Sequence, residues 1–249
     1  MTEKIDKYKV QAALVRSFFD AFSHGVIESQ VEDRNEKTTP QSVKKLMLEH
    51  YEHIAPAFFD TMFFPLAAMN YKYEEIAALA REAQQRGDDM MALVRTACGD
   101  EAYYNAMVEE YKRNFSMLLA GRHLSNADHL EGYVRNAEET EASVDSDRAI
   151  ELTVRVVMFA YVRGLRQTGE SARFDRSAHL GQVHPLRGAT LFRLMLDAMN
   201  ILLLDEAVDF ADAEAADLAS LFLKVCQTQH NFTVMTNEMD RTYSELMKE

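Results

Sequence analysis

The chain has 249 residues, enough to bury a large core in one large domain or two small ones. Its net charge of −13 opposes non-specific binding to nucleic acid or to an anionic membrane, because both carry phosphate. With only 9 glycines and 4 prolines, and with abundant Ala, Leu, Met and Glu, the composition favours helices over sheets. We therefore predict an all-α protein, a compact bundle of about nine to ten helices.

Cysteine content and the first residues bear on location. Cys98 and Cys226 are the only cysteines, and each lies in an apolar helical setting. Such usage is typical of a reducing compartment. The start, MTEKIDKYKV, lacks the apolar stretch of a secretory signal, so we expect a cytoplasmic protein.

The first helix is predicted from an apolar residue at every fourth position. These residues are Val10, Leu14, Phe18, Phe22 and Val26. Thr39 followed by Pro40 predicts the start of a second helix that runs to about His53. Pro56 and Pro65 are expected to break the next apolar stretch into a short helix and a turn, because proline lacks a backbone donor.

Capping residues mark the helices that follow. A helix from Tyr73 to Arg86 is closed by Gly87, and Asp88 can cap the next one, which Gly99 closes. Asp100 then caps a longer helix, which has an apolar face at i, i+3 and i+4 spacing. All of these helices are expected to be amphipathic.

The middle of the chain is acidic. A helix is predicted for about residues 125–135, and the acidic stretch 138–147 follows it. That stretch is either a domain boundary near 136–147 or an exposed loop that ends in a helix cap. We prefer the loop, so that residues 1–249 form a single helical domain. Ile150 to Gln167 is then an apolar helix, with a buried strand as the alternative suggested by its β-branched residues.

Residues 189–208 are the most apolar run of helical length, and we predict that this helix lies at the centre of the bundle. Its polar residues Arg193, Asp197 and Asn200 fall on one line. One interpretation is a narrow solvent-facing strip with an i,i+4 pair of Arg193 and Asp197. The other is that the line faces an internal pocket or a subunit interface, where the three residues orient a ligand.

The helix at 150–167 also has a charged line. Glu151, Arg155 and Arg166 lie along it. A further hypothesis places Glu151 and Arg155 against Arg193 and Asp197 on the predicted central helix.

The last predicted helix begins with Asp212 as its cap and runs to the C-terminus. Apolar residues recur in it every seven positions: Leu218, Val225, Phe232, Met239 and Leu246. This heptad pattern indicates either a coiled coil that pairs two copies or a long helix packed within its own bundle.

The long irregular segment at 168–188 is the predicted binding site, because loops of this length inside a compact domain are often functional. It contains Arg173, Arg176, Arg187, His179 and His184. Guanidinium and imidazole groups suit a carboxylate, a phosphate or an acidic protein surface. The alternative is that these arginines pair with carboxylates elsewhere in the chain.

Signals for catalysis or metal binding are few. Glu49 and His53 have i,i+4 spacing, but the sequence offers no paired Glu-x-x-His set. His179 and Asp175 have the spacing of a dyad without an identifiable nucleophile. We therefore expect no metal site and favour a protein that is not an enzyme.

One segment resembles a known family. His179, His184 and Pro185 followed by a long apolar helix are similar to the globin pattern around the proximal histidine. The helix at 150–167 then resembles the distal helix, and Phe115 falls in the helix before it. The resemblance implies a haem-binding or haem-less globin-like sensor with His179 as iron ligand; otherwise we expect no cofactor.

Together these features predict a non-catalytic cytoplasmic regulatory or adaptor protein that dimerises through its last helix. It would bind an acidic protein partner or a small anion near residues 168–188 and would bind neither nucleic acid nor membrane. The alternative is a ligand-sensing helical domain, with the globin-like sensor as its most specific form.

Overall fold

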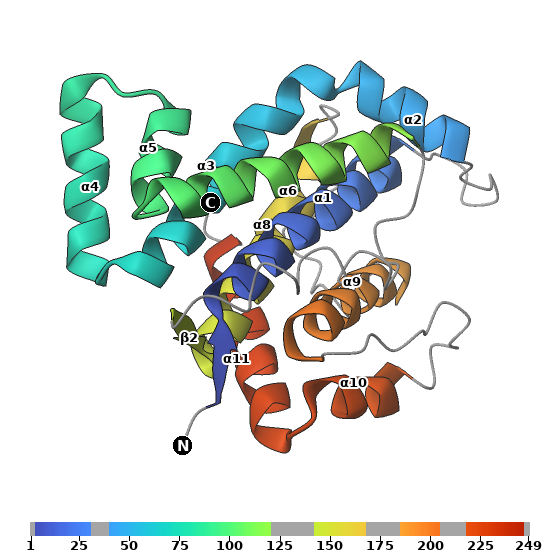
Figure 1. The fold of residues 1–249 in the computed structure, drawn as a ribbon. Helices are drawn as coiled ribbons and strands as arrows, with labels where there is room; N and C mark the ends of the chain where they lie inside the picture. The colour runs from blue at the N-terminus through green and yellow to red at the C-terminus, as the bar shows by residue number, and fades with distance from the viewer. Residues whose placement is uncertain (1–2, 31–39, 121–141, 168–184, 205–217, 247–249) are drawn as a thin grey trace.

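A computed structural model describes residues 3–30, 40–120, 142–167, 185–204 and 218–246 (Figure 1). In this part of the chain the helices are α1 (Lys7–Gln30), α2 (Pro40–Glu49), α3 (Tyr51–Asn70), α4 (Tyr73–Arg86), α5 (Met90–Ala97), α6 (Glu101–Leu119), α8 (Ser146–Gln167), α9 (Pro185–Leu203), α10 (Leu218–Cys226) and α11 (Gln229–Leu246). Two short strands, β1 (Lys4–Asp6) and β2 (Ser143–Asp145), pair with each other. The predicted all-α fold is confirmed.

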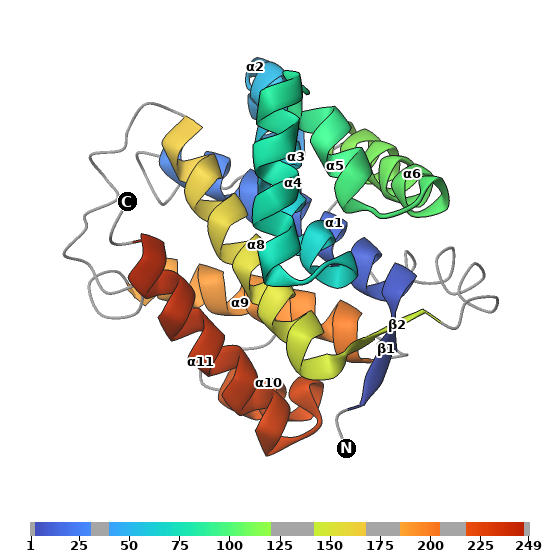
Figure 2. The same ribbon diagram turned by 90° about the vertical axis from the view of Figure 1, so that its left-hand side faces the viewer.

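The centre of the bundle is α1, which packs along α8 and also contacts α2, α3, α6 and α9. Its aromatic residues Phe18, Phe19 and Phe22 are fully buried. We expected the 189–208 helix at the centre. In the structure that helix, α9, packs on one side of the α1 and α8 pair (Figure 2). The central place goes to α1 because it is buried around more of its circumference than the every-fourth-residue pattern suggested.

Two glycines allow α1 and α8 to approach closely. A Cβ added to Gly25 would overlap the carbonyl oxygen of Tyr161 and lie 2.9 Å from the backbone nitrogen of Leu165. A Cβ added to Gly164 would overlap the carbonyl oxygen of Phe22 and lie 2.9 Å from the nitrogen of Val26. The two glycines therefore occupy equivalent places in a symmetric helix crossing.

The strand pair repeats this symmetry. β1 and β2 are antiparallel, and Ile5 lies opposite Val144 at the middle of the pair. At one end the backbone N–H of Lys7 donates to the carbonyl of Ala142 (3.1 Å). At the other end Ser146 donates to Glu3 in the same way (2.9 Å). Each strand leads directly into one of the two central helices.

The helices α5, α6, α10 and α11 continue the relation, whereas α2 and α4 have no counterpart among the described residues. α6 packs on α1 and α5 on α3, as α11 packs on α8 and α10 on α9. Gly99 and Gln227, which separate these helix pairs, both have positive φ (82° and 62°). Asp100 then accepts a hydrogen bond from the Tyr103 N–H, and Thr228 accepts one from Asn231. The molecule thus consists of two halves built on one plan and related by a pseudo-twofold axis.

Two elements correct the sequence predictions. Pro56 and Pro65 do not break the chain, because α3 runs continuously through both. A proline inside a helix costs about 3 kcal/mol. The buried side chains of Phe58, Met62 and Leu66 on the same helix each contribute about 1.5–3 kcal/mol, which offsets that cost.

The predicted single C-terminal helix is also wrong, since Gln227 separates α10 from α11. The side of α11 that carries Met235 and Leu246 is buried, and the helix lies along α8 (Figure 2). This heptad face therefore packs inside the protein's own bundle. Dimerisation through the C-terminal helix stays a prediction.

Several local predictions are confirmed. Gly87 ends α4 with φ 72°, and Asp100 caps α6. The cap of α5 is Asp89, one residue after the expected Asp88, and it accepts a hydrogen bond from the Ala92 N–H. The predicted helix at 125–135 lies outside the described residues, as do residues 138–141 of the acidic stretch, whereas residues 143–145 of that stretch form β2 and Ser146 begins α8. None of the described helices is both long and apolar enough to cross a membrane.

Candidate functional site

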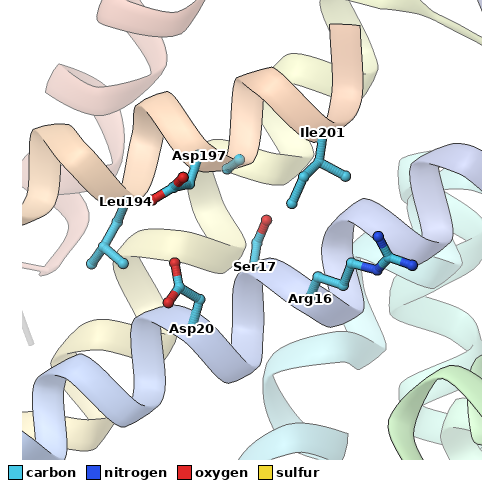
Figure 3. A pocket seen from close by; sticks show the side chains of 7 residues that line it. Arg16, Ser17, Asp20, Leu194, Asp197 and Ile201 are labelled. Carbon is cyan, nitrogen blue, oxygen red and sulfur yellow. The ribbon is translucent and has the colours of Figure 1, made fainter. Parts of the chain in front are cut away.

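The polar line of α9 faces α1. Asp197 lines a cavity of about 10 Å³ between the two helices, about the space of one water molecule. Arg16, Ser17, Asp20, Leu194, Ala198 and Ile201 complete the wall (Figure 3). Asn200 is buried on the same helix and does not line the cavity, whereas Arg193 is exposed. The solvent-facing interpretation is thus wrong for Asn200, whereas Asp197 is half-buried and its charge still interacts with that of Arg193.

Three ionisable groups interact at this cavity. Figure 3 shows Asp20 and Asp197 directed toward each other from α1 and α9. Burial, together with the Asp20 charge, raises the pKa of Asp197 to about 8, although His24 and Arg193 oppose the rise. Burial alone would lower the pKa of His24, but the adjacent Asp20 carboxylate raises it to about 9. Both Asp197 and His24 therefore hold a proton more tightly than the free side chains do.

Ser17 is 4% exposed and lines the same cavity. Its buried hydroxyl has no hydrogen-bond partner among the described residues. The cavity beside it is large enough for one water, which needs two to four polar partners. This cavity can accommodate a water molecule but not an organic ligand.

The second charged line does not meet the first. Arg155 on α8 binds two carboxylates of α11: its Nη1 lies 3.3 Å from Oε1 of Glu238, and its Nη2 lies 2.6 Å from Oε2 of Glu245. Glu151 pairs with Arg148 on the same helix (3.2 Å). The hypothesis that Glu151 and Arg155 face α9 is therefore wrong. The reason is that their side of α8 is covered by α11.

A larger pocket lies between α3 and α8. Its volume is about 140 Å³, and its walls are mainly apolar with charged groups at both ends. It is lined by Asp60, Thr61, Phe64 and Pro65 from α3, and by Arg155, Val156, Phe159 and Arg163 from α8. A cavity of this size and character is sufficient for a single aromatic ring.

Arg155 is the most constrained cation of the pocket. Its guanidinium carbon lies 5.4 Å from the ring centre of Phe64 and 5.7 Å from that of Phe159, within the range of cation–π attraction. Burial would lower the pKa of Arg155, but hydrogen bonds and charge from Glu245 and Glu238 raise it. Arg163, at the other end, pairs with Asp60. The pocket therefore presents a permanent positive charge beside two aromatic rings.

Thr61 adds a polar group to the α3 wall. The residue is 8% exposed, and its hydroxyl has no partner among the described residues. Because Pro65 has no backbone N–H, the carbonyl of Thr61 also lacks its usual helical donor. A buried hydroxyl without a partner costs about 1–3 kcal/mol, which is typical of a position kept for a purpose other than stability.

The two pockets lie at equivalent contacts between the two halves, one between α1 and α9 and the other between α3 and α8. Arg155 corresponds to Arg16, Phe159 to Asp20 and Arg163 to His24 along the symmetric helices α8 and α1. Asp60 on α3 corresponds to Asp197 on α9. The α1/α9 position is narrow and acidic, whereas the α3/α8 position is wider, aromatic and basic.

Most of the predicted binding loop cannot be placed. Arg173, Arg176, His179 and His184 lie outside the described residues, so neither the globin-like histidine nor the Asp175 dyad is tested. Residues 185–188, expected in the loop, begin α9. Arg187 belongs to that helix, and its side chain is outside the description. Within the described ranges no group of three or more His, Cys, Asp or Glu residues could hold a metal ion.

The α3/α8 pocket residues were missed by sequence reasoning. Thr61 and Phe64 stand in the stretch that two prolines seemed to break, and Phe159 looked like an ordinary apolar position. The one available signal was Arg155 in the charged line of the 150–167 helix. Its pairing with α11 depends on residues more than 80 positions away, which no local pattern reveals.

Comparison of the chain with models of known protein families, with characterised proteins and with solved structures finds no match. The fold and its pockets therefore define the class by themselves. The described residues form a mostly helical protein of two related halves, with an inter-helix pocket at each of two equivalent contacts between the halves.

Proposed function

We propose that this is a non-catalytic regulatory protein that binds a small organic anion in the α3/α8 pocket. The observation that carries the proposal is the joint presence of Arg155, Arg163 and two aromatic rings around a volume of about 140 Å³. A pre-formed apolar pocket with a few directed polar groups is the usual form of a small-molecule site.

Charge favours an anionic ligand. The lining includes two arginines and one aspartate: Arg163 pairs with Asp60, and Arg155 faces Glu238 and the 41%-exposed Glu245. A carboxylate ligand can compete for Arg155, whereas a cationic ligand would meet two guanidinium groups.

The lining residues support binding over catalysis. Arginine stays protonated at any working pH and does not serve as a general acid or base. Thr61, the one hydroxyl of the wall, has neither a histidine nor a lysine beside it in the pocket lining to activate it. The arrangement supplies recognition of charge and shape.

The test is calorimetric titration of the full chain with sodium benzoate, benzylamine and phenol, which share a ring and differ in charge. We expect benzoate alone to saturate one site. Arg163→Gln leaves the Asp60 carboxylate at the pocket without its cation, so it should weaken binding of the benzoate anion about tenfold. Arg166→Gln removes the same charge from an exposed position that does not line the pocket, and should leave binding unchanged. If no anion binds, or if both variants weaken it equally, the proposal is wrong.

The predicted dimer and acidic protein partner belong to the same regulatory proposal. The exposed apolar residues Phe192 on α9 and Leu223 on α10 offer a surface for such contacts beside the buried heptad face. Light scattering of the full chain during size exclusion, compared with a Leu223→Glu variant, tests self-association. A monomeric mass for both would remove the dimer from the proposal.

A further inference from the structure

We infer that the ligand of the α3/α8 pocket is a planar carboxylate of about the size of benzoate, and that its carboxylate takes the place of Glu245 on Arg155. This inference rests on the proposed function and specifies its ligand. The inference follows from a difference between the two carboxylates that bind Arg155: Glu238 is buried and has further partners, whereas Glu245 is partly exposed.

Glu238 is the permanent partner of Arg155. It is 3% exposed, and it also accepts a hydrogen bond from Thr242 (3.1 Å) and pairs with Arg241 (2.6 Å). Glu245 is 41% exposed, and its only described partner is Arg155. Water can therefore replace Arg155 at Glu245 at small cost, whereas Glu238 cannot leave without losing three partners.

The other half of the molecule shows that the second carboxylate is not needed to hold the helix. There Arg16 binds Glu110 at 2.6 Å, and Glu110 is also held by Arg113 and Asn114. The position that corresponds to Glu245 is Met117, which packs against the core. A second carboxylate partner of the central-helix arginine is therefore found only at Arg155, the arginine that lines the larger pocket.

Charge balance fits an exchange of one carboxylate for another. With Glu245 in place, Arg155 faces two carboxylates. When a ligand carboxylate replaces Glu245, Arg155 still faces two carboxylates. The displaced Glu245 carboxylate is then solvated by water. A neutral ligand would gain no ion pair, and a cation would meet the fixed charge of Arg155.

The walls select a flat ligand. The rings of Phe64 and Phe159 both lie within 6 Å of the guanidinium carbon, and Val156 and Pro65 complete the apolar lining. An aromatic ring beside them makes edge-to-face or stacked contacts that an aliphatic ring of the same size does not make. In the equivalent α1/α9 cavity these aromatic positions are Asp20 and Ile201, and no such surface exists.

The exchange has a consequence for α11. Glu245 lies next to Leu246, the last residue of this helix, so its release removes a tie between the end of α11 and α8. The final turn should then open more often, whereas Glu238 keeps the middle of the helix docked. Amide hydrogen exchange reports this opening directly.

The experiment titrates sodium benzoate into the wild type, Glu245→Gln and Glu109→Gln. Glu109 is an exposed glutamate on α6 that pairs with Lys112, so it is a matched control for the loss of one surface charge. Because Glu245 competes with the ligand, we expect Glu245→Gln to bind benzoate about fivefold more tightly, the equivalent of one exposed ion pair. Glu109→Gln should bind benzoate with the affinity of the wild type.

Amide hydrogen exchange is the second measurement. Benzoate should speed amide exchange in the last turn of α11 in the wild type and not in Glu245→Gln.

The outcomes separate this inference from the proposed function. Equal benzoate affinity in the wild type and Glu245→Gln, with unchanged exchange in α11, would overturn the exchange of carboxylates and leave anion binding standing. Equal affinity for cyclohexanecarboxylate would overturn the planar ligand. If neither protein binds benzoate, acetate or phosphate, the proposed function fails, and the inference fails with it. Thermal unfolding of each variant checks that it is folded.

Discussion

Gly25 and Gly164 accept no side chain where α1 crosses α8. An added Cβ at either position would overlap a backbone carbonyl of the other helix, so the helices themselves must move apart. We expect Gly25→Ala to lower the free energy of unfolding by about 3 kcal/mol, and Gly164→Ala to do the same. Urea denaturation measures both.

The control for this prediction is Gly87→Ala. Gly87 has φ 72° and no atom within 4 Å of an added Cβ, so the substitution carries only the backbone penalty of about 1–2 kcal/mol. A Gly25→Ala variant no less stable than Gly87→Ala would contradict the close crossing.

Asp197 makes stability depend on pH. In the folded protein its pKa is about 8, raised by burial and by Asp20, whereas an unfolded aspartate titrates near 4. Between these values the folded state keeps a proton that the unfolded state releases, so stability falls as pH rises and levels off above pH 8. His24, with a folded pKa of about 9, adds a fall between about pH 6.5 and pH 9.

Asp197→Asn should therefore gain stability relative to the wild type as pH rises. We expect the difference to grow by about 1 kcal/mol or more between pH 5 and pH 8, measured by urea denaturation at each pH. Asp60→Asn, at the equivalent position of the other half, is the control. A difference between Asp197→Asn and the wild type that stays constant with pH would contradict the protonated Asp197.

At the scale of elements, a buried ion pair joins α1 to α6. Arg16 and Glu110 are both buried and lie 2.6 Å apart. Removal of Arg16 leaves the Glu110 charge buried with only Arg113 and Asn114. We expect Arg16→Met to cost about 3–5 kcal/mol, and the double variant Arg16→Met with Glu110→Leu to recover most of it.

A double-mutant cycle on these two positions gives the coupling. The exposed pair of Arg95 and Glu101, at 2.6 Å, is the comparison, and Arg95→Gln should leave the free energy of unfolding nearly unchanged, because solvent screens the pair. Equal costs for Arg16→Met and Arg95→Gln would mean that the α1 and α6 contact does not depend on the buried pair.

The helices could be predicted from the sequence wherever their signals are local. The apolar spacing of α1 and the caps of α4 and α6 lie within a few residues of one another, so the pattern alone was sufficient. α3 could not be predicted in this way, because burial by distant helices outweighs the cost of its two prolines. The α3/α8 pocket was hidden for the same reason: Thr61 and Arg155 meet only through tertiary packing.

The break between α10 and α11 shows how the pattern misled. The heptad spacing continues across Gln227, although the backbone there turns through a positive φ of 62°. Gly99 marks the equivalent turn in the first half, where glycine makes the break visible. Gln227 gives no such signal, so only comparison of the two halves would have located it.

At the scale of the whole molecule, the two halves share one framework and differ at one place. The crossing glycines, the capped turns and the buried pairs of arginine and glutamate occur in both halves. The pockets on α1 and α8 do not match: one holds two facing acids and the other holds aromatic rings beside arginines. The framework therefore accounts for the fold, and the difference between the pockets is where function is expected.

This arrangement predicts that the chain can be divided and still assemble. A fragment that ends at Ala120 and one that begins at Ala142 each contain one central helix, and their largest contact is with each other through α1 and α8. Each fragment alone would expose Phe18 and Phe22 or Tyr161, so co-expressed fragments should associate one to one. A tag on one fragment should retrieve the other, and native mass spectrometry should give the stoichiometry.

Gly25→Leu in the first fragment should abolish the association, because no leucine fits at the crossing. A tagged fragment that purifies folded and alone would show instead that each half is an independent domain.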